Sequence, residues 1–166
     1  MKRTFFATMI GCSLFAGSLF AKEACELELK SGVDAAGNKN PMAYNLKKIE
    51  IPASCSEFKI NLTNDSGLDR KTFGHNVVVT KAADMQPVSV DGIAAGLDNE
   101  YVKSGDKRVI ASTKVIGSGE GPVSLTLKVS ELSASESYKF FCSFPGHTAM
   151  MQGDLVVLKA ADAKKS

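Results

Sequence analysis

The chain has 166 residues, a length that fits one domain, and its 20 Lys and Arg residues are balanced by 18 Asp and Glu residues, for a formal net charge of +2. Nucleic-acid-binding proteins usually carry a basic excess gathered on one face, so this balance argues against that class. With 44% hydrophobic and 23% charged residues the composition is that of a globular protein, and four Cys are too few for a disulfide scaffold.

Residues 1–21 have the layout of a secretory signal peptide, with two basic residues, then an apolar run, then the small residue Ala21. A membrane-spanning helix needs roughly 20 apolar residues, and this run is interrupted by Gly and Ser and falls short. Lipid attachment at Cys12 is a minor alternative, because the residues before it match a lipoprotein motif poorly. We expect cleavage after Ala21 and export to a bacterial periplasm, leaving a single mature domain over residues 22–166 without a membrane span.

Cleavage would change the charge balance and the cysteine count. It removes two basic residues and no acidic ones, leaving 18 of each sign and no net charge, so a partner must be recognised through a local patch. It also leaves three Cys, an odd number for an oxidising compartment. Cys25 and Cys55 lie close in sequence, and a bridge between them would stabilise the protein by roughly 3–4 kcal/mol on the loop-entropy model. Cys142 would then be unpaired, and it would be either a buried inert thiol or a thiol to which a ligand or ion is bound.

The body of the chain alternates apolar and polar residues with a period of two and is rich in β-branched and aromatic residues, which predicts half-buried strands. Clusters of Gly, Pro, Asn and Asp separate the segments and predict turns, including one at residues 38–41. Seven or eight strands without alternating helices indicate an all-β antiparallel sandwich with Greek-key connections. The expected strands are Glu26–Lys30, Leu46–Ile51, Phe58–Leu62, His75–Thr80, Val109–Val115, Val123–Val129, Ser137–Cys142 and Gly153–Lys159.

The segment from Ala82 to Lys103 departs from this pattern. Its small and mixed residues are compatible with one short helix interrupted by Pro87 and Gly92. We expect it to form a helical flap outside the sheets.

A thiol, an imidazole and a thioether occur together in one short connection, Cys142-Ser-Phe-Pro-Gly-His147-Thr-Ala-Met-Met151. The only other histidine, His75, opens an expected strand far upstream. Two imidazoles, one thiolate and a weak axial thioether make up the trigonal site of blue-copper electron carriers. Each residue alone has a structural explanation, but one site accounts for all of them, so the pattern predicts a metal centre holding one copper ion as Cu(II) or Cu(I).

Three other chemistries use similar residues. A zinc site typically recruits a further Cys, His or carboxylate at short spacing, and none is apparent. A hydrolase built on Cys142 and His147 would need a residue to orient the base and a substrate cleft. A copper storage or delivery protein tends to use exposed clusters of Met, His and Cys, whereas here only Met150 and Met151 are adjacent.

Over residues 22–166 the chain resembles the azurin family, a group of type 1 blue copper proteins with the cupredoxin fold. The resemblance rests on segments such as Gly74-His75-Asn76, Ala82-Ala83-Asp84-Met85-Gln86, Ile116-Gly117-Ser118-Gly119-Glu120 and Phe140-Phe-Cys-Ser-Phe-Pro-Gly-His147. Four residues separate Cys142 from His147 and three separate His147 from Met151, which is similar to azurin and longer than the plastocyanin loop.

The resemblance implies a role for each site residue. His75, Cys142 and His147 would be equatorial copper ligands, with axial contacts from Met151 and the carbonyl of Gly74. Asn76 would tie the two ligand-bearing segments together by hydrogen bonds. The family's disulfide falls on Cys25 and Cys55, in agreement with the cysteine count. The chain departs from the best-known members in having Val77 where they carry a buried Trp, and Met150 where Leu is often found.

An apolar surface around His147 is the expected docking site for redox partners. The loop itself supplies Phe144, Pro145, Gly146, Ala149 and Met150, and the resemblance adds Leu68, Phe73 and Ile93. Redox encounters use small interfaces, which suits a neutral protein that must bind and release quickly. The resemblance implies c-type cytochromes and periplasmic reductases as partners.

Overall fold

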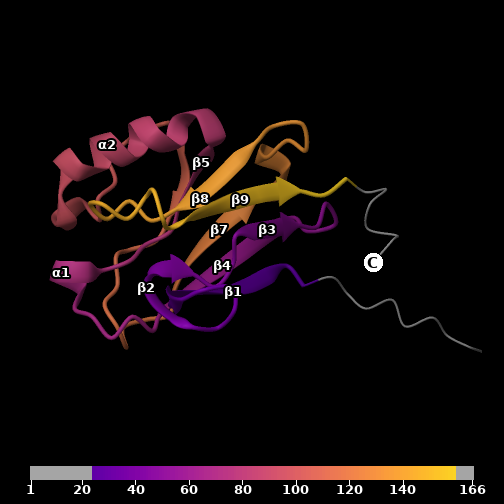
Figure 1. The fold of residues 1–166 in the computed structure, drawn as a ribbon. Coiled ribbons are helices and arrows are strands. Elements are labelled where there is room, and N and C mark those ends of the chain that lie inside the picture. Colours follow the sequence, from indigo (N-terminus) through magenta and orange to yellow (C-terminus); the bar gives the residue numbers. More distant parts are fainter. Residues whose placement is uncertain (1–23, 160–166) are drawn as a thin grey trace, which may run out of the picture.

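Residues 24–159, which the computed structural model describes, form two β-sheets packed face to face (Figure 1). One sheet has four strands in the order β2-β1-β4-β7, and the other has five in the order β3-β9-β8-β5-β6. The expected all-β sandwich is confirmed. The strands in this part of the chain are β1 (Glu26–Val33), β2 (Lys39–Tyr44), β3 (Lys48–Ile51), β4 (Glu57–Asn64), β5 (Val78–Lys81), β6 (Val109–Ser112), β7 (Val123–Lys128), β8 (Tyr138–Phe141) and β9 (Gln152–Val157).

Two features of the sheets differ from the sequence prediction. The sheets are mixed, because β1 pairs with β4 and β3 pairs with β9 in parallel registers. The chain passes from the first sheet at β2 to the second at β3 and back at β4, which brings strands distant in sequence side by side. The turn expected at residues 38–41 is also wrong, since Lys39 begins β2. Pro41 is tolerated there because β2 is an edge strand.

The core lies between the sheets and follows the alternation of each strand. In β7, for example, Leu125 and Leu127 are buried while Ser124 and Thr126 are exposed. Burial of each large aliphatic side chain stabilises the fold by about 1.5–3 kcal/mol. Val77, which stands where the resemblance implies a Trp, is fully buried in this core. Other fully buried side chains from the two sheets are Leu29, Ile60, Leu62, Ile49, Phe140 and Leu155.

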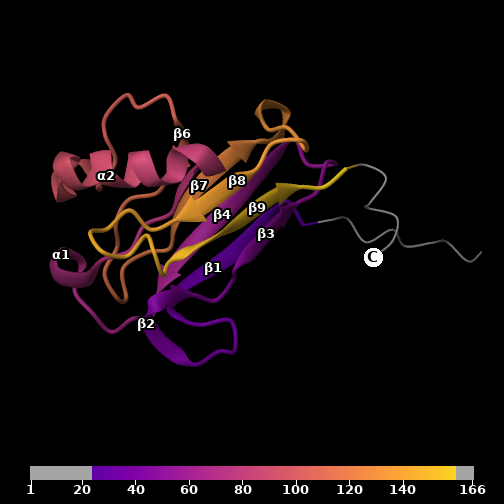
Figure 2. The ribbon, with the colours of Figure 1, turned by 45° about the horizontal axis from the view of Figure 1, so that its top comes forward.

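A helix, α2 (Met85–Ala95), lies against the outer face of the five-stranded sheet, as expected for the flap (Figures 1 and 2). It packs there through Val88, which forms a small buried cluster with Val78 and Phe141. The expected interruption is wrong. Pro87 falls in the first helical turn, where no backbone N–H donor is needed, and Gly92 gives room for the Tyr101 carbonyl, which would lie 2.2 Å from a Cβ atom.

Short helical turns complete the described chain. The single-turn helix α1 (Arg70–Phe73), which the sequence did not indicate, begins after Asp69, whose carboxylate accepts a hydrogen bond from the Lys71 N–H. Three 3₁₀ turns are η1 (Ala82–Asp84), η2 (Leu97–Asn99) and η3 (Val129–Glu131).

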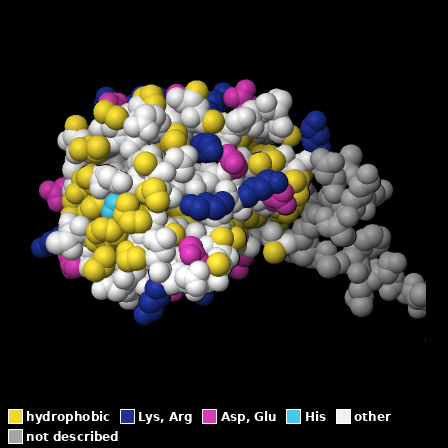
Figure 3. Space-filling model, viewed as in Figure 1, with side chains coloured by type: hydrophobic (Ala, Val, Ile, Leu, Met, Phe, Trp, Pro, Cys, Tyr) yellow, Lys and Arg dark blue, Asp and Glu magenta, His cyan; other side chains and the backbone are white. Residues whose placement is uncertain are grey.

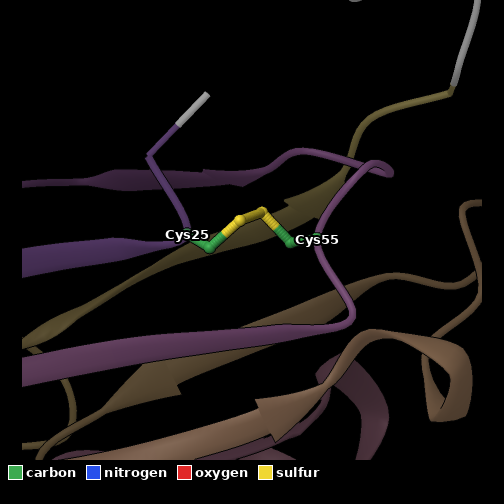
Figure 4. The surroundings of a disulfide bond; sticks show 2 residues. All are labelled: Cys25 and Cys55. Atoms are coloured by element: carbon green, nitrogen blue, oxygen red, sulfur yellow. A yellow bond between two sulfur atoms is a disulfide. The ribbon is translucent and has the colours of Figure 1, made fainter. Parts of the chain in front are cut away.

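The predicted disulfide between Cys25 and Cys55 is confirmed (Figure 4). It joins the start of β1 to the loop before β4, at the end of the sandwich away from α1 (Figure 1). Among residues 24–159 no helix is both long and apolar enough to cross a bilayer. The signal peptide expected over residues 1–21 lies outside the described residues.

Candidate metal centre

His75 is held by a short bridge outside the sheets. The sequence predicted a strand from His75, but β5 begins only at Val78. His75 instead pairs with Ile116, its N–H donating to the Ile116 carbonyl (3.0 Å) and its carbonyl accepting from the Ile116 N–H (2.8 Å). The side chain is fully buried. This bridge fixes the first imidazole to the segment before β7.

Cys142, His147 and Met151 lie on the loop between β8 and β9. The Cys142 N–H donates to the Met151 carbonyl at 2.9 Å, which closes the base of the loop. Inside it, the His147 carbonyl accepts from the N–H groups of Met150 and Met151. Cys142 and Met151 are fully buried, and His147 is 3% exposed. The hairpin geometry therefore turns a thiol and an imidazole inward together.

The three predicted equatorial ligands converge. The Cys142 sulfur lies 3.8 Å from Nδ1 of His75 and 3.6 Å from Nδ1 of His147, and one ligand atom from each residue lies within 4.8 Å of the others. These residues come from two segments 67 positions apart. Two imidazole nitrogens and one sulfur fit copper, since thiolate suits Cu(I) and imidazole suits Cu(II).

Burial sets the protonation of all three groups. It raises the pKa of the Cys142 thiol to about 11, so the metal-free thiol is protonated at neutral pH. It lowers the pKa of His147 to about 4 and, with the neighbouring charge of His147, that of His75 to about 3. The Pro41 backbone partly opposes the decrease at His75, although the buried Nε2 of His75 makes no hydrogen bond of normal geometry. Both imidazoles are neutral at pH 7 and are available as ligands.

Asn76 connects the two ligand-bearing segments. Its Oδ1 accepts from the Ser143 N–H at 3.0 Å, and its Nδ2 donates to the Ser143 hydroxyl at 2.9 Å. Its own carbonyl accepts from the hydroxyl of Tyr44, which is fully buried. Asn76 follows His75 and Ser143 follows Cys142, so these bonds fix the two ligand positions relative to each other.

The helix α2 is also linked to the ligand loop, through a contact that the sequence did not indicate. Thr148 Oγ1 donates to the Cys142 carbonyl at 2.9 Å and lies 2.6 Å from Ser89 Oγ. Because the single Thr148 proton is used toward Cys142, Ser89 is the donor in the second bond. No motif marks Ser89 or Tyr44 in the sequence, because their roles arise only when distant segments meet.

Gly74 is buried, but its conformation is an ordinary extended one, with φ −75° and ψ 164°. A Cβ atom would lie 2.4 Å from Val115 Cγ1 and 2.5 Å from the Arg70 carbonyl oxygen. The tight packing of α1 and Val115 on both sides of the residue is therefore a structural reason for glycine at position 74.

An apolar face surrounds the point where His147 approaches the surface, and Figure 3 shows hydrophobic side chains gathered around a histidine on this face. Leu68, Ile93 and Met150 are 39%, 50% and 58% exposed. The rings of Phe73 and Phe144 pack on His147 with centroids 4.5 and 4.7 Å away. Phe144 is itself buried, so it supports this face from beneath and does not contribute exposed area to it.

The known proteins that are similar to this chain are copper-binding proteins. Residues 31–158 match the model for copper binding proteins of the plastocyanin/azurin family. The chain is 49% identical over 130 residues to an azurin from Pseudomonas fluorescens biotype B, covering 78% of this chain and 98% of the relative. It is 52% identical over 129 residues to an azurin from Bordetella pertussis, covering 78% and 85%.

A solved structure is similar over the same region. The azurin Az-iso2 from Methylomonas sp. strain J superposes with a TM-score of 0.74 at 43% sequence identity. The match covers 82% of this chain and 99% of that one.

Proposed function

Because this chain belongs to the plastocyanin/azurin family of copper-binding proteins, we propose that it carries single electrons between redox proteins of the periplasm. The protein is a blue copper electron carrier, and its cofactor is one copper ion. The observation that carries this conclusion is the convergence of His75, Cys142 and His147, whose ligand atoms lie within 4.8 Å of one another in a buried site.

In this proposal Nδ1 of His75, Nδ1 of His147 and the Cys142 sulfur would hold the ion. The Met151 thioether and the Gly74 carbonyl would make weaker contacts with it. Bound copper supplies a one-electron Cu(II)/Cu(I) couple. The chain supplies rigidity, because the His75–Ile116 bridge and the Asn76–Ser143 bonds hold the ligands in place whichever oxidation state is present. Burial of the site keeps water from adding to the ligand set.

Electrons are proposed to pass through His147, the ligand nearest the surface. The apolar face of Leu68, Ile93, Ala149 and Met150 around it is exposed, and the net charge of residues 22–166 is zero. Such a face favours brief contact with a partner, since a small interface with few charged contacts releases easily. The proposed partners are c-type cytochromes and periplasmic reductases.

The proposed location and processing rest on the sequence. Residues 1–21 have the order of basic, apolar and small residues that directs export, so we assign them as a cleaved signal peptide and residues 22–166 as the mature domain. The Cys25–Cys55 disulfide supports an oxidising compartment.

The structure disfavours the two alternative functions. A hydrolase needs a reactive thiolate within reach of substrate, whereas Cys142 is fully buried and its pKa is raised to about 11. We therefore propose that the protein is not an enzyme. A copper donor needs a site from which the ion can be handed over, but all three candidate equatorial ligands are buried.

Redox cycling with a c-type cytochrome tests the proposed function. The copper-loaded protein is mixed with reduced cytochrome, reoxidised and mixed again, in the presence of a copper chelator. A carrier transfers about one electron per protein in every cycle and keeps its copper. Loss of copper to the chelator in the first cycles, or no electron exchange, would contradict the proposal and support a storage role.

A further inference from the structure

We infer that Arg70 and Glu100 form a clamp that positions both ligand-bearing segments of the copper site, although neither residue touches a ligand side chain. The inference rests on the proposed ligand set. The convergence of the three ligands does not by itself explain what holds their backbone segments in position.

The clamp begins with an ion pair that is shared with one backbone segment. Arg70 Nη2 lies 3.0 Å from both carboxylate oxygens of Glu100. Arg70 Nε donates to the Val115 carbonyl at 2.8 Å, and the Val115 N–H donates to Glu100 Oε2 at 2.7 Å. Both polar groups of the Val115 backbone are therefore bound by the same pair. Val115 is adjacent to Ile116, which makes the two-bond bridge to His75.

Glu100 is also linked to the other ligand-bearing segment, through Asn76. Its carbonyl accepts from Asn76 Nδ2 at 2.9 Å, and Asn76 Oδ1 accepts from the N–H of Ser143, next to Cys142. Glu100 is thus linked to His75 through Val115 and Ile116, and to Cys142 through Asn76 and Ser143.

The backbone at Glu100 is strained in a way that this role explains. Glu100 and Tyr101 have φ values of 57° and 52°, in the left-handed region that non-glycine residues rarely adopt. The strained turn aims the Glu100 carbonyl at Asn76 and places the Tyr101 ring on Phe144, with centroids 5.0 Å apart. Phe144 in turn packs on His147. Such strain persists only where the surrounding contacts enforce it.

The packing around Arg70 is correspondingly tight. A Cβ atom on Gly117 would lie 2.6 Å from the Arg70 backbone nitrogen, and one on Gly74 would lie 2.5 Å from the Arg70 carbonyl oxygen. The backbone of α1 is therefore seated between two glycines that flank His75 and Ile116. The side chains of Arg70 and Glu100 are 31% and 28% exposed, and pairs at that exposure contribute little to stability on their own. Their directional hydrogen bonds to Val115 indicate that the pair fixes the position of the Val115 segment.

The test compares Arg70→Met with Arg108→Met in the copper-loaded protein. Arg108 is a matched control, because it is 32% exposed and pairs with Asp91 and Asp106, outside the ligand-bearing segments. Copper dissociation into excess chelator, the copper hyperfine splitting in electron paramagnetic resonance, and the midpoint potential are measured beside the melting temperature. A change in melting temperature alone would indicate a merely structural role. Changes in the copper dissociation rate, the hyperfine splitting or the midpoint potential would report a change in the positions of the ligands.

We expect Arg70→Met to release copper roughly 10-fold faster than the unaltered protein and to change the hyperfine splitting, in line with the effect of outer-shell partners on metal affinity. Arg70→Lys keeps the charge but cannot bind Glu100 and Val115 together, so its values should be intermediate. Arg108→Met should match the unaltered protein in all three site measurements even if it melts earlier.

Equal site measurements for Arg70→Met and Arg108→Met would overturn the inference. If Arg70→Met does not fold, Glu100→Gln decides the question, because it keeps the side chain's size and weakens the pair. An unaltered spectrum, potential and copper release rate in Glu100→Gln would also overturn it. A colourless copper-loaded parent protein would instead refute the proposed function, so the two failures are distinguishable.

Discussion

Asn76 and Ser143 hydrogen-bond to each other in both directions, through Asn76 Oδ1 and the Ser143 N–H at 3.0 Å and through Asn76 Nδ2 and the Ser143 hydroxyl at 2.9 Å. The two residues are 67 positions apart in the chain and directly follow His75 and Cys142. The relative position of the two ligands therefore depends on one buried amide.

Replacing that amide should weaken both the fold and the site. Asn76→Ala leaves the Ser143 N–H and the Glu100 carbonyl without their partner, which should lower the free energy of unfolding by about 2–4 kcal/mol. Copper affinity should fall roughly 10- to 100-fold. Denaturant unfolding and chelator competition measure the two effects. Asn61→Ala is the control, because Asn61 bonds Glu28 and Ser124, away from the site, and it should leave copper affinity unchanged. Equal copper affinity in the Asn76 variant would contradict this role.

Met151→Leu should leave a blue site with a higher midpoint potential. The Met151 side chain is fully buried, and exchanging Met for Leu costs less than about 1.5 kcal/mol, so the fold should survive. Removing a weak axial thioether takes electron density from the copper and favours Cu(I). Voltammetry gives the potential, and Met85→Leu, on α2, serves as the control. A potential equal to that of the parent protein would mean that Met151 is not axial.

Met150→Lys should slow electron exchange with a c-type cytochrome while leaving the visible spectrum almost unchanged. Met150 is 58% exposed on the apolar face, and a charge there disfavours contact between apolar surfaces. Stopped-flow mixing gives the exchange rate. Ile110→Lys adds the same charge at another exposed apolar position, on β6, and should not affect the rate. If both variants exchange as fast as the parent, the apolar face is not the docking site.

Copper uptake at pH 7 should release about one proton per ion. The proton comes from Cys142, because burial raises its pKa to about 11 and keeps the metal-free thiol protonated. The histidines release none, because burial lowers the pKa values of His75 and His147 to about 3 and about 4. Apparent affinity should therefore rise about tenfold per pH unit between pH 5 and pH 10, and below pH 4 protonation of His147 should make it fall more steeply.

Calorimetric titrations in buffers of different ionisation enthalpy measure this release. Cys142→Ser protein should release no proton with this pH dependence, since the serine hydroxyl stays protonated throughout. Uptake without proton release by the unaltered protein would show that Cys142 is ionised before binding or is not a ligand.

The sequence predicted the class of fold and the site because both depend on local or scarce features. Alternation of apolar and polar residues requires only the strand itself, so β4 and β7 were located to within two residues. The site could be predicted because the chain has two histidines, and His147 shares a short loop with Cys142. Because the chain has so few histidines, there are few ways to combine them with Cys142 in one site.

The rest depends on contacts between distant segments. Pro41 and its neighbours resemble a turn, but they form an edge strand because β1 is available to pair with them. Gly92 would weaken an isolated helix, yet α2 continues through it because the Tyr101 carbonyl packs against it. The Arg70–Glu100 pair joins positions 30 residues apart, and neither residue belongs to a motif. Such contacts appear only once the two sheets have formed.

The absorption spectrum of the oxidised, copper-loaded protein, recorded beside that of Cys142→Ser, tests whether the three ligands bind one copper ion. The intense blue colour requires charge transfer from the Cys142 sulfur to Cu(II). The parent protein should develop this band in proportion to added Cu(II), up to about one ion per chain, and Cys142→Ser should lack it. A colourless parent protein, or a blue Cys142→Ser protein, would contradict the central claim that Cys142, His75 and His147 bind the same ion.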